Sequence, residues 1–271
     1  MYDYHLHSHF SGDCEEEMEN TILEAIKRGG KHLCFTDHLD YDYPDTEIQF
    51  EFDAEGFIET FEHLKEKYRD EIHLQRGIEV GLQPHVIEQS LQFIKYFKPE
   101  FILCSFHVAE KKDLYRGDFF EGKTPEEAWD VYLEDIITTL TNFKEYSVVG
   151  HLDILKRYNE GVKSIPYAYY KEKVDMILKI IIEDKKGIEV NMSGLRSDLN
   201  ETLPHIDIIK RYYELGGKYI TIGSDAHLKE DIYSHFEEML EMLQDIGFEY
   251  FTIYNHKKPE QISIKSTLES L

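Results

Sequence analysis

Residues 147–191 contain the pattern that decides the fold: the apolar run Ser147-Val148-Val149-Gly150, the amphipathic segment 167–183, and a second apolar run, Gly187-Ile188-Glu189-Val190-Asn191. Each flanking run has the length of a buried strand, and the segment between them has the length and spacing of a helix. Strand, helix and strand in this order form the unit that builds parallel sheets. The stretch therefore predicts an α/β fold.

The same alternation extends along nearly the whole chain. Apolar runs predict strands at 2–5, 32–36, 72–80, 101–105, 147–150, 187–191 and 219–223, and the run 249–254 could form an eighth. Helical patterns cover 18–28, 53–68, 86–97, 125–142, 167–183, 203–215 and 231–245, with Thr124 as the expected N-cap of the fourth. Seven or eight such units favour a barrel over an open sheet, and we expect a single domain over residues 1–271.

Composition restricts the function. The 271 residues include 30 Lys+Arg and 54 Asp+Glu, a formal net charge of −24, which argues against binding to the phosphate backbone of nucleic acids. The three widely spaced cysteines give neither a disulfide framework nor a cysteine-type zinc finger. This cysteine usage fits a reducing cytoplasm, so we expect a cytoplasmic protein. The sequence shows no recognisable secretory signal or membrane segment. The sequence does not indicate its oligomeric state.

Two segments lack strand or helix periodicity, at 37–55 and 113–123. We interpret them as long loops over one end of the barrel. Loops that follow barrel strands usually carry the active site, so both are candidates for shaping a substrate pocket.

Histidines and carboxylates follow the predicted strands where each strand ends. Six of the seven strands are followed or terminated in this way, by His5 and His7, His38, Glu79, His107, His151, and Asp225 with His227. Each alone has a simpler interpretation: a buried core histidine for His107 or His151, a turn-capping carboxylate for Glu79, a helix N-cap for Asp225. Because the carboxyl ends of parallel barrel strands face one mouth, their convergence favours a polynuclear metal site.

Imidazoles and carboxylates without thiolates suit zinc, iron or manganese at open catalytic positions better than a structural zinc site. A carboxylate such as Glu79 can bridge two cations. Two cations about 3.5 to 4 Å apart can hold a hydroxide while neutralising a phosphoryl group, so the residues point to hydrolysis of a phosphate ester.

The motifs Tyr4-His5-Leu6-His7, Phe35-Thr36-Asp37-His38, Gly77-Ile78-Glu79, Ser105-Phe106-His107, Gly150-His151-Leu152-Asp153 and Gly223-Ser224-Asp225-Ala226-His227 follow one another in order. As a set they resemble the polymerase and histidinol phosphatase (PHP) superfamily, and within it the single-domain histidinol-phosphate phosphatases. The resemblance implies a distorted (βα)7 barrel with three divalent transition metals that hydrolyses L-histidinol phosphate in histidine biosynthesis.

The resemblance also assigns ligands. It implies a first metal on His5, His7, Glu79 and Asp225, a second on Glu79, His107 and His151, and a third on Asp13, His38 and His227. Asp13 departs from the family pattern, because many members have a histidine there. Among these ligands, Glu79, Asp225 and His227 are expected to take the catalytic roles.

Arg157 and Arg196 fall in loops expected at the same mouth, and each guanidinium could grip a phosphate dianion. Arginines at similar positions contact the phosphate in the resembling enzymes. His9 could contact the substrate or support a ligand, whereas Arg116 and the remaining histidines are interpreted as surface or strand-start residues.

Two alternative functions stay open. One is a PHP-type protein-tyrosine phosphatase, which predicts a wide and shallow mouth; the long loops favour a closed pocket instead. The other is a noncatalytic PHP module, which predicts missing ligands, whereas the sequence has only the substitution at Asp13.

Overall fold

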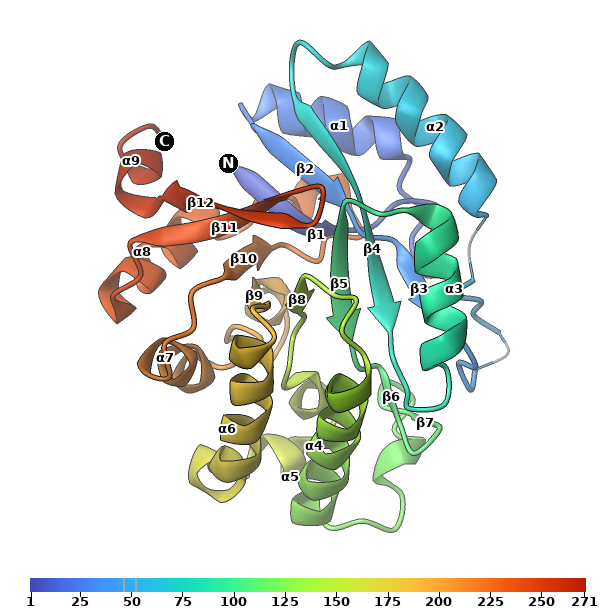
Figure 1. Ribbon diagram of the computed structural model, residues 1–271, viewed down its shortest axis with the longest axis vertical. Helices are drawn as coiled ribbons and strands as arrows, with labels where there is room; N and C mark the ends of the chain where they lie inside the picture. The colour runs from blue at the N-terminus through green and yellow to red at the C-terminus, as the bar shows by residue number, and fades with distance from the viewer. Residues whose placement is uncertain (46, 52) are drawn as a thin grey trace.

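The computed structural model describes residues 1–45, 47–51 and 53–271. Seven parallel strands form a nearly closed barrel in the order β1-β2-β4-β5-β8-β9-β10, surrounded by helices (Figure 1). They are β1 (Tyr2–Leu6), β2 (His32–Phe35), β4 (His73–Gly81), β5 (Phe101–Ser105), β8 (Val148–Val149), β9 (Gly187–Asn191) and β10 (Ile220–Gly223). First and last strands meet where the Asp225 N–H donates to the His5 carbonyl at 2.7 Å and the His7 N–H to the Ala226 carbonyl at 2.9 Å. The predicted (βα)7 barrel is confirmed.

The chain continues past β2 into a further strand, β3 (His38–Asp40). Phe35 pairs with Arg76 and His38 with Glu79, so β2 and β3 keep one register along β4. The predicted loop at 37–55 is therefore wrong at its start: the segment is polar, yet its first residues join the sheet. Two other positions of that predicted loop, 46 and 52, lie outside the described residues.

Helices cover the outside of the barrel. They are α1 (Met18–Lys27), α2 (Ala54–Lys67), α3 (Ile87–Phe97), α4 (Pro125–Asn142), α5 (Glu160–Lys163), α6 (Tyr167–Glu183), α7 (Ile206–Glu214), α8 (Phe236–Ile246) and α9 (Ile264–Leu268). Thr124 caps α4 as predicted, in a capping box with Glu127. Their apolar faces join the barrel strands in one core cluster that runs from Leu6 to Ile264.

Two predicted helices begin later than expected. The helix predicted at 203–215 starts at Ile206, because Pro204 precedes it and His205 is its N-cap. The helix predicted at 231–245 starts at Phe236, because a 3-10 turn, η4 (Lys229–Asp231), comes first and both Tyr233 and His235 have left-handed backbone angles.

The run predicted as a possible eighth strand does form a strand, β11 (Tyr250–Asn255), but it pairs antiparallel with β12 (Lys258–Ser263) outside the barrel. This hairpin lies against the N-terminal ends of the barrel strands. The Tyr254 N–H donates to the Tyr4 hydroxyl at 2.9 Å, and the Tyr254 hydroxyl donates to the Ser147 carbonyl at 3.0 Å. The hairpin thereby covers one end of the barrel with apolar and aromatic groups. The polar residues at the carboxyl ends of the strands face the opposite, open end.

The second predicted loop, 113–123, is partly ordered into regular structure. Asp113 ends the hairpin β6 (Val108–Ala109) and β7 (Lys112–Asp113), and a 3-10 turn, η1 (Asp118–Phe120), follows. The hairpin extends from the carboxyl end of β5 (Figure 1). It therefore stands at the open mouth of the barrel, as the loop was expected to do.

Within the part of the chain that the structure describes, no helix combines the length and apolar character needed to cross a bilayer.

Candidate active site at the mouth of the barrel

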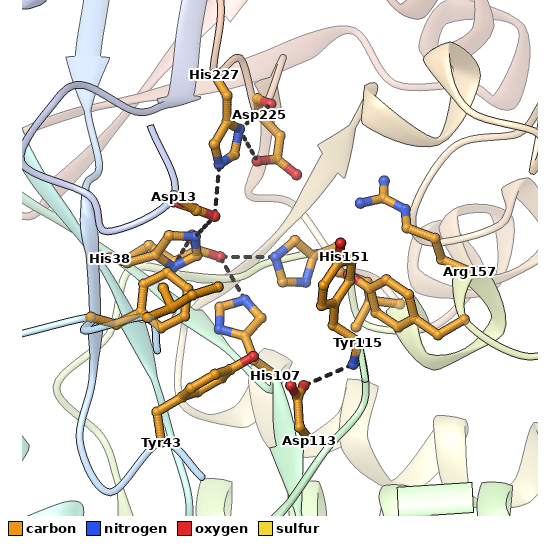
Figure 2. Close-up of a pocket in the computed structure, with 15 residues that line it drawn as sticks. Asp13, His38, Tyr43, His107, Asp113, Tyr115, His151, Arg157, Asp225 and His227 are labelled. Atoms are coloured by element: carbon orange, nitrogen blue, oxygen red, sulfur yellow. Dashed lines mark hydrogen bonds and ion pairs between the residues drawn. The ribbon is translucent and has the colours of Figure 1, made fainter. Parts of the chain in front are cut away.

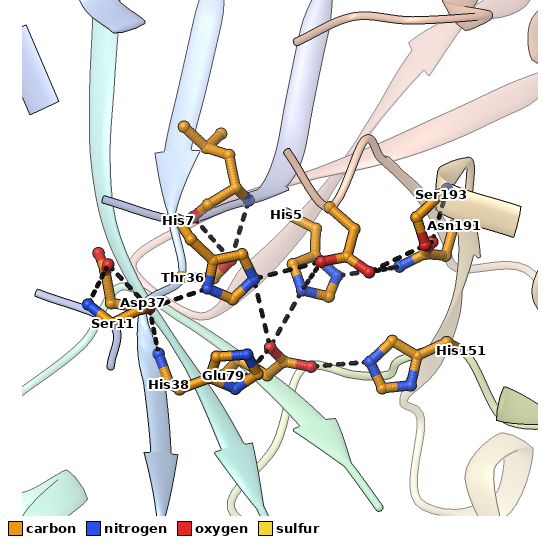
Figure 3. Close-up of polar contacts among 12 residues, drawn as sticks. His5, His7, Ser11, Thr36, Asp37, His38, Glu79, His151, Asn191 and Ser193 are labelled. Carbon is orange, nitrogen blue, oxygen red and sulfur yellow. Dashed lines mark hydrogen bonds and ion pairs between the residues drawn. The ribbon is translucent and has the colours of Figure 1, made fainter. Parts of the chain in front are cut away.

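The Glu79 carboxylate, fully buried near the end of β4, lies at the centre of the site. One oxygen, Oε2, is 3.1 Å from His5 Nε2, 3.2 Å from His38 Nδ1 and 3.5 Å from His7 Nε2. The other, Oε1, is 2.8 Å from His151 Nε2 and 3.3 Å from His107 Nε2. Five imidazoles from four strand ends thus converge on one carboxylate; Figure 3 labels four of them, His5, His7, His38 and His151, around Glu79.

Four groups of three side chains have ligand atoms close enough to hold a metal ion, within 4.8 Å of one another. The groups are His7-His38-His227, His5-His7-Asp225, His5-Glu79-His151 and His38-Glu79-His107. Asp13 stands beside the first of them, with Oδ2 3.2 Å from His227 Nε2 and 3.6 Å from His38 Nε2. The structure therefore brings together all nine side chains that the sequence singled out as ligands.

Among the described residues, these groups contain buried ring nitrogens that make no hydrogen bond, and this suits the groups to binding a cation. His7 Nε2 is buried and makes no hydrogen bond to a described residue, although Asp225 Oδ1 lies 3.3 Å away. Burial, together with the neighbouring His227 and His38, lowers the pKa of His7 to about 3, so its ring is neutral at pH 7. A neutral, unpaired imidazole nitrogen beside carboxylates is a ready metal ligand.

When no metal is bound, the neighbouring carboxylates keep other imidazole rings protonated. Burial alone would lower the pKa of His5, but Glu189, Glu79 and Asp225 outweigh it and hold that pKa well above its ordinary value. The pKa of His38 is raised to about 9, since Glu79 and Asp13 more than offset burial. That of His107 is likewise well above normal, because Asp40 and Glu79 overcome its burial. In the metal-free site, protons on these rings therefore offset the negative charge of the carboxylates.

Two buried carboxylates that the sequence analysis missed orient the ligand rings. Glu189 Oε1 is 2.6 Å from His5 Nδ1, and Asp40 Oδ1 is 2.6 Å from His107 Nδ1. Carboxylates in this position fix the ring orientation and the tautomer that points the other nitrogen at a metal. Glu189 is the single charged residue in the apolar run 187–191, a signal that could have identified it.

Glycines make room for these two acids. A Cβ on Gly223 would lie 2.3 Å from Glu189 Oε1 and 2.4 Å from the His5 Cβ, and a Cβ on Gly81 would lie 1.8 Å from Asp40 Oδ1. Strand glycines often mark such close approaches.

The predicted phosphate-binding arginines differ in placement. Arg157, at the end of the 3-10 turn η2 (Ile154–Arg157), lines the cavity at the mouth, donates to the Ser193 hydroxyl, and has a buried Nε without a partner among the described residues. Arg196, in η3 (Ser193–Arg196), donates to the Ser234 hydroxyl at 2.8 Å and the Asp225 carbonyl at 3.1 Å. It is not among the described residues that line the cavity.

His9 also stands apart from the cavity lining, with Nδ1 3.4 Å from Glu17 Oε2 and its ring against Phe10. Arg116 forms ion pairs with Asp45 and Glu47, as a surface cation would. By contrast His32, interpreted as a surface or strand-start residue, is buried and pairs with Gln75 Oε1 at 3.0 Å.

Aromatic and aliphatic side chains form the rest of the cavity wall, beside the candidate metal-binding groups (Figure 2). They are Tyr43, Ile48, Phe50, Tyr115, Ile154 and Tyr158. Figure 2 places Arg157 and Asp113 on separate parts of this wall. The cavity thus contains three parts: a cluster of side chains that could bind cations, an arginine that could bind an anion, and a wall of less polar side chains.

Comparison with known proteins agrees with this geometry. The family model described as "PHP domain" matches residues 3–193. A histidinol-phosphatase of Lactococcus lactis is 30% identical over 258 residues, covering 94% of this chain and 95% of that protein. A probable histidinol-phosphatase of Thermotoga maritima is also 30% identical, covering 95% and 97%.

Solved structures extend the comparison. The crystal structure of histidinol phosphate phosphatase from Lactococcus lactis, complexed with zinc, L-histidinol and phosphate, superposes with a TM-score of 0.88 at 30% identity, covering 96% of this chain and 98% of that one. A putative histidinol phosphatase from Listeria monocytogenes, at 20% identity and a TM-score of 0.76, shares the fold.

Metal binding should release protons from this site. Zn²⁺ needs neutral imidazoles, whereas His5, His38 and His107 are protonated at pH 7 in the metal-free protein. We expect several protons to be released per chain and zinc affinity to rise with pH towards about 9, the pKa of His38. Calorimetry of Zn²⁺ binding in buffers of different ionisation enthalpy measures this release, and binding without net proton release would contradict the charge balance described.

Proposed function

This chain belongs to the PHP domain family, and from that premise we propose that it is a metal-dependent phosphatase that hydrolyses L-histidinol phosphate to L-histidinol and phosphate. The observation that carries the proposal is the convergence of five imidazoles on the buried Glu79 carboxylate, in one cavity with Arg157. The extended match to a histidinol-phosphatase, 30% identical over 94% of this chain, supports the choice of substrate. The reaction belongs to histidine biosynthesis.

The nine ligating side chains fit three divalent transition metals, zinc, iron or manganese. His5, His7, Glu79 and Asp225 would hold the first, Glu79, His107 and His151 the second, and Asp13, His38 and His227 the third. When bound, the metals would supply hydroxide at neutral pH and neutralise phosphoryl oxygens. The zinc in the structure of the Lactococcus relative supports this choice of metals.

The chain's own residues have distinct tasks. Glu79 would provide negative charge to two metal positions, and Asp225 and His227 would complete the groups beside it. Glu189 and Asp40 keep His5 and His107 oriented, 2.6 Å from their ring nitrogens. Because these partners are buried and fixed by strands, little reorganisation is needed during the reaction.

Phosphate recognition is assigned to Arg157 and Arg196. The free Nε of Arg157 and its place in the cavity wall support a direct contact with the phosphate. Arg196 would have to exchange its bond with Ser234 for one with the phosphate. His9 is also proposed to contact the substrate. To do so, its ring would have to exchange its contact with Glu17 for one with the substrate.

We further propose that residues 1–271 act as a single PHP unit, since one core cluster runs through the barrel and its helices. A cytoplasmic location suits the three free, buried cysteines. The ligands of the Lactococcus relative support a small-molecule partner.

The first test is substrate and metal dependence. Purified protein should contain transition metal, approaching three ions per chain. It should hydrolyse L-histidinol phosphate far faster than a phosphotyrosine peptide, because aromatic and aliphatic side chains wall the cavity beside the ligands. Prolonged chelation should abolish turnover. Elemental analysis with steady-state kinetics measures both, and metal-free protein with full activity would overturn the proposal.

The second test separates phosphate binding from metal binding. Arg157→Ala and Arg196→Ala should leave metal content unchanged, because neither guanidinium is a ligand. Each should lower kcat/KM about ten- to a hundredfold, the effect of a lost charge-assisted hydrogen bond of about 1.5–3 kcal/mol. Wild-type kinetics in either variant would remove that arginine from phosphate recognition.

A further inference from the structure

Asp113 occupies a distinctive position in the cavity wall. It ends β7, whose partner β6 begins immediately after His107, and the Leu114 N–H donates to the His107 carbonyl at 3.2 Å. The backbone therefore holds Asp113 beside a metal-ligating histidine. The residue is only 2% exposed, yet it lines the same cavity as Glu79 and Arg157.

The Asp113 carboxylate has only neutral partners among the described residues. Its Oδ1 accepts a hydrogen bond from the Tyr115 N–H at 2.8 Å, and its Oδ2 is buried and makes no hydrogen bond of good geometry to a described residue. The neighbouring cation along the chain, Arg116, is bound to Asp45 and Glu47 instead. Tyr43 also interacts with this carboxylate, but its phenol carries no charge, and no ion pair joins Asp113 to a cation among the described residues. A buried carboxylate without a cationic partner is costly, so the position favours a cation from outside the protein.

The surroundings favour a positively charged donor. Tyr43, Tyr115 and Tyr158 line the cavity with Asp113, and the rings of Tyr115 and Tyr158 meet edge to face with centroids 5.7 Å apart. Burial, the Asp113 charge and a hydrogen-bond contact with the Asp113 carboxylate all raise the pKa of Tyr43, so its phenol stays neutral and leaves the charge of Asp113 without a cationic partner. Aromatic walls around a carboxylate form a low-dielectric compartment in which a cation binds strongly.

We propose that Asp113 is a specificity-determining residue that binds the ammonium group of the substrate. The inference rests on the proposed function: L-histidinol phosphate carries a primary ammonium on the carbon next to its phosphate-bearing CH₂ group. Amines of this kind are largely protonated at neutral pH, whereas an imidazole is mostly neutral there. With the phosphate at Arg157 and the metal ligands, the ammonium would reach Asp113 and the imidazole would pack against the tyrosines.

The test compares two substrates that differ only in the ammonium group. L-histidinol phosphate and its des-amino analogue, 3-(imidazol-4-yl)propyl phosphate, are assayed with metal-loaded wild-type enzyme and with Asp113→Asn, which can still accept from the Tyr115 N–H. We expect kcat/KM for L-histidinol phosphate to fall about ten- to a hundredfold, mainly through KM, and kcat/KM for the analogue to change by less than about twofold. Asp113→Glu, which keeps the charge, should restore part of the loss.

Glu121→Gln is the matched control, since it removes a charge from an exposed position in the same connection and should leave both substrates unaffected. An equal loss on both substrates in Asp113→Asn would overturn the inference and make Asp113 a structural residue. Equal wild-type activity on the two substrates would also overturn it, while leaving the phosphatase function intact. Wild-type enzyme without activity on L-histidinol phosphate would remove the proposed function and this inference together.

Discussion

Burying the Glu79 carboxylate among imidazoles is the constraint on which the rest of the structure depends. A carboxylate removed from water is stable only when positive charge or hydrogen-bond donors replace its hydration. The barrel supplies them from strands far apart in sequence, with His5 and His151 as the closest contacts at 3.1 and 2.8 Å. In the metal-free state protons on the rings provide the compensating charge, and in the proposed active state metal ions would take their place.

The proposed exchange of protons for metal ions would account for the layer of polar side chains behind the candidate ligands. A stable core does not need the two buried carboxylates of Glu189 and Asp40. Each carboxylate fits only because a glycine lies opposite it, Gly223 for Glu189 and Gly81 for Asp40. Asn191 extends the layer, with Nδ2 donating to Glu189 at 3.2 Å and to Asp225 at 3.3 Å. Such networks fix ring orientations in advance, which is the property a metal site needs for rapid chemistry.

The sequence was informative where strand periodicity and residue chemistry coincide. His107 and His151 were predictable because each directly follows an apolar run, and parallel strands bring such positions to one mouth. β3 was not predictable, since His38-Leu39-Asp40 is too short and polar to read as a strand and pairs only because β4 continues beside it. Glu189 carries a local signal as the one charged residue in an apolar run, but its partner does not, because the contact with His5 spans 184 residues. Arg196 followed the expected strand end, yet its bonds to Ser234 and Asp225 turn it away from the cavity lining.

The central claim is that one shared carboxylate organises a metal centre, and Glu79→Gln tests it most directly. The substitution keeps the side-chain volume and removes the charge that two metal positions would share. The measurement is metal content per chain together with kcat, with the exposed Glu71→Gln as a control and circular dichroism to verify folding. The account predicts a folded variant that has lost metal and several orders of magnitude in turnover. Near-normal metal content and kcat in Glu79→Gln would contradict it and leave Glu79 as a structural carboxylate.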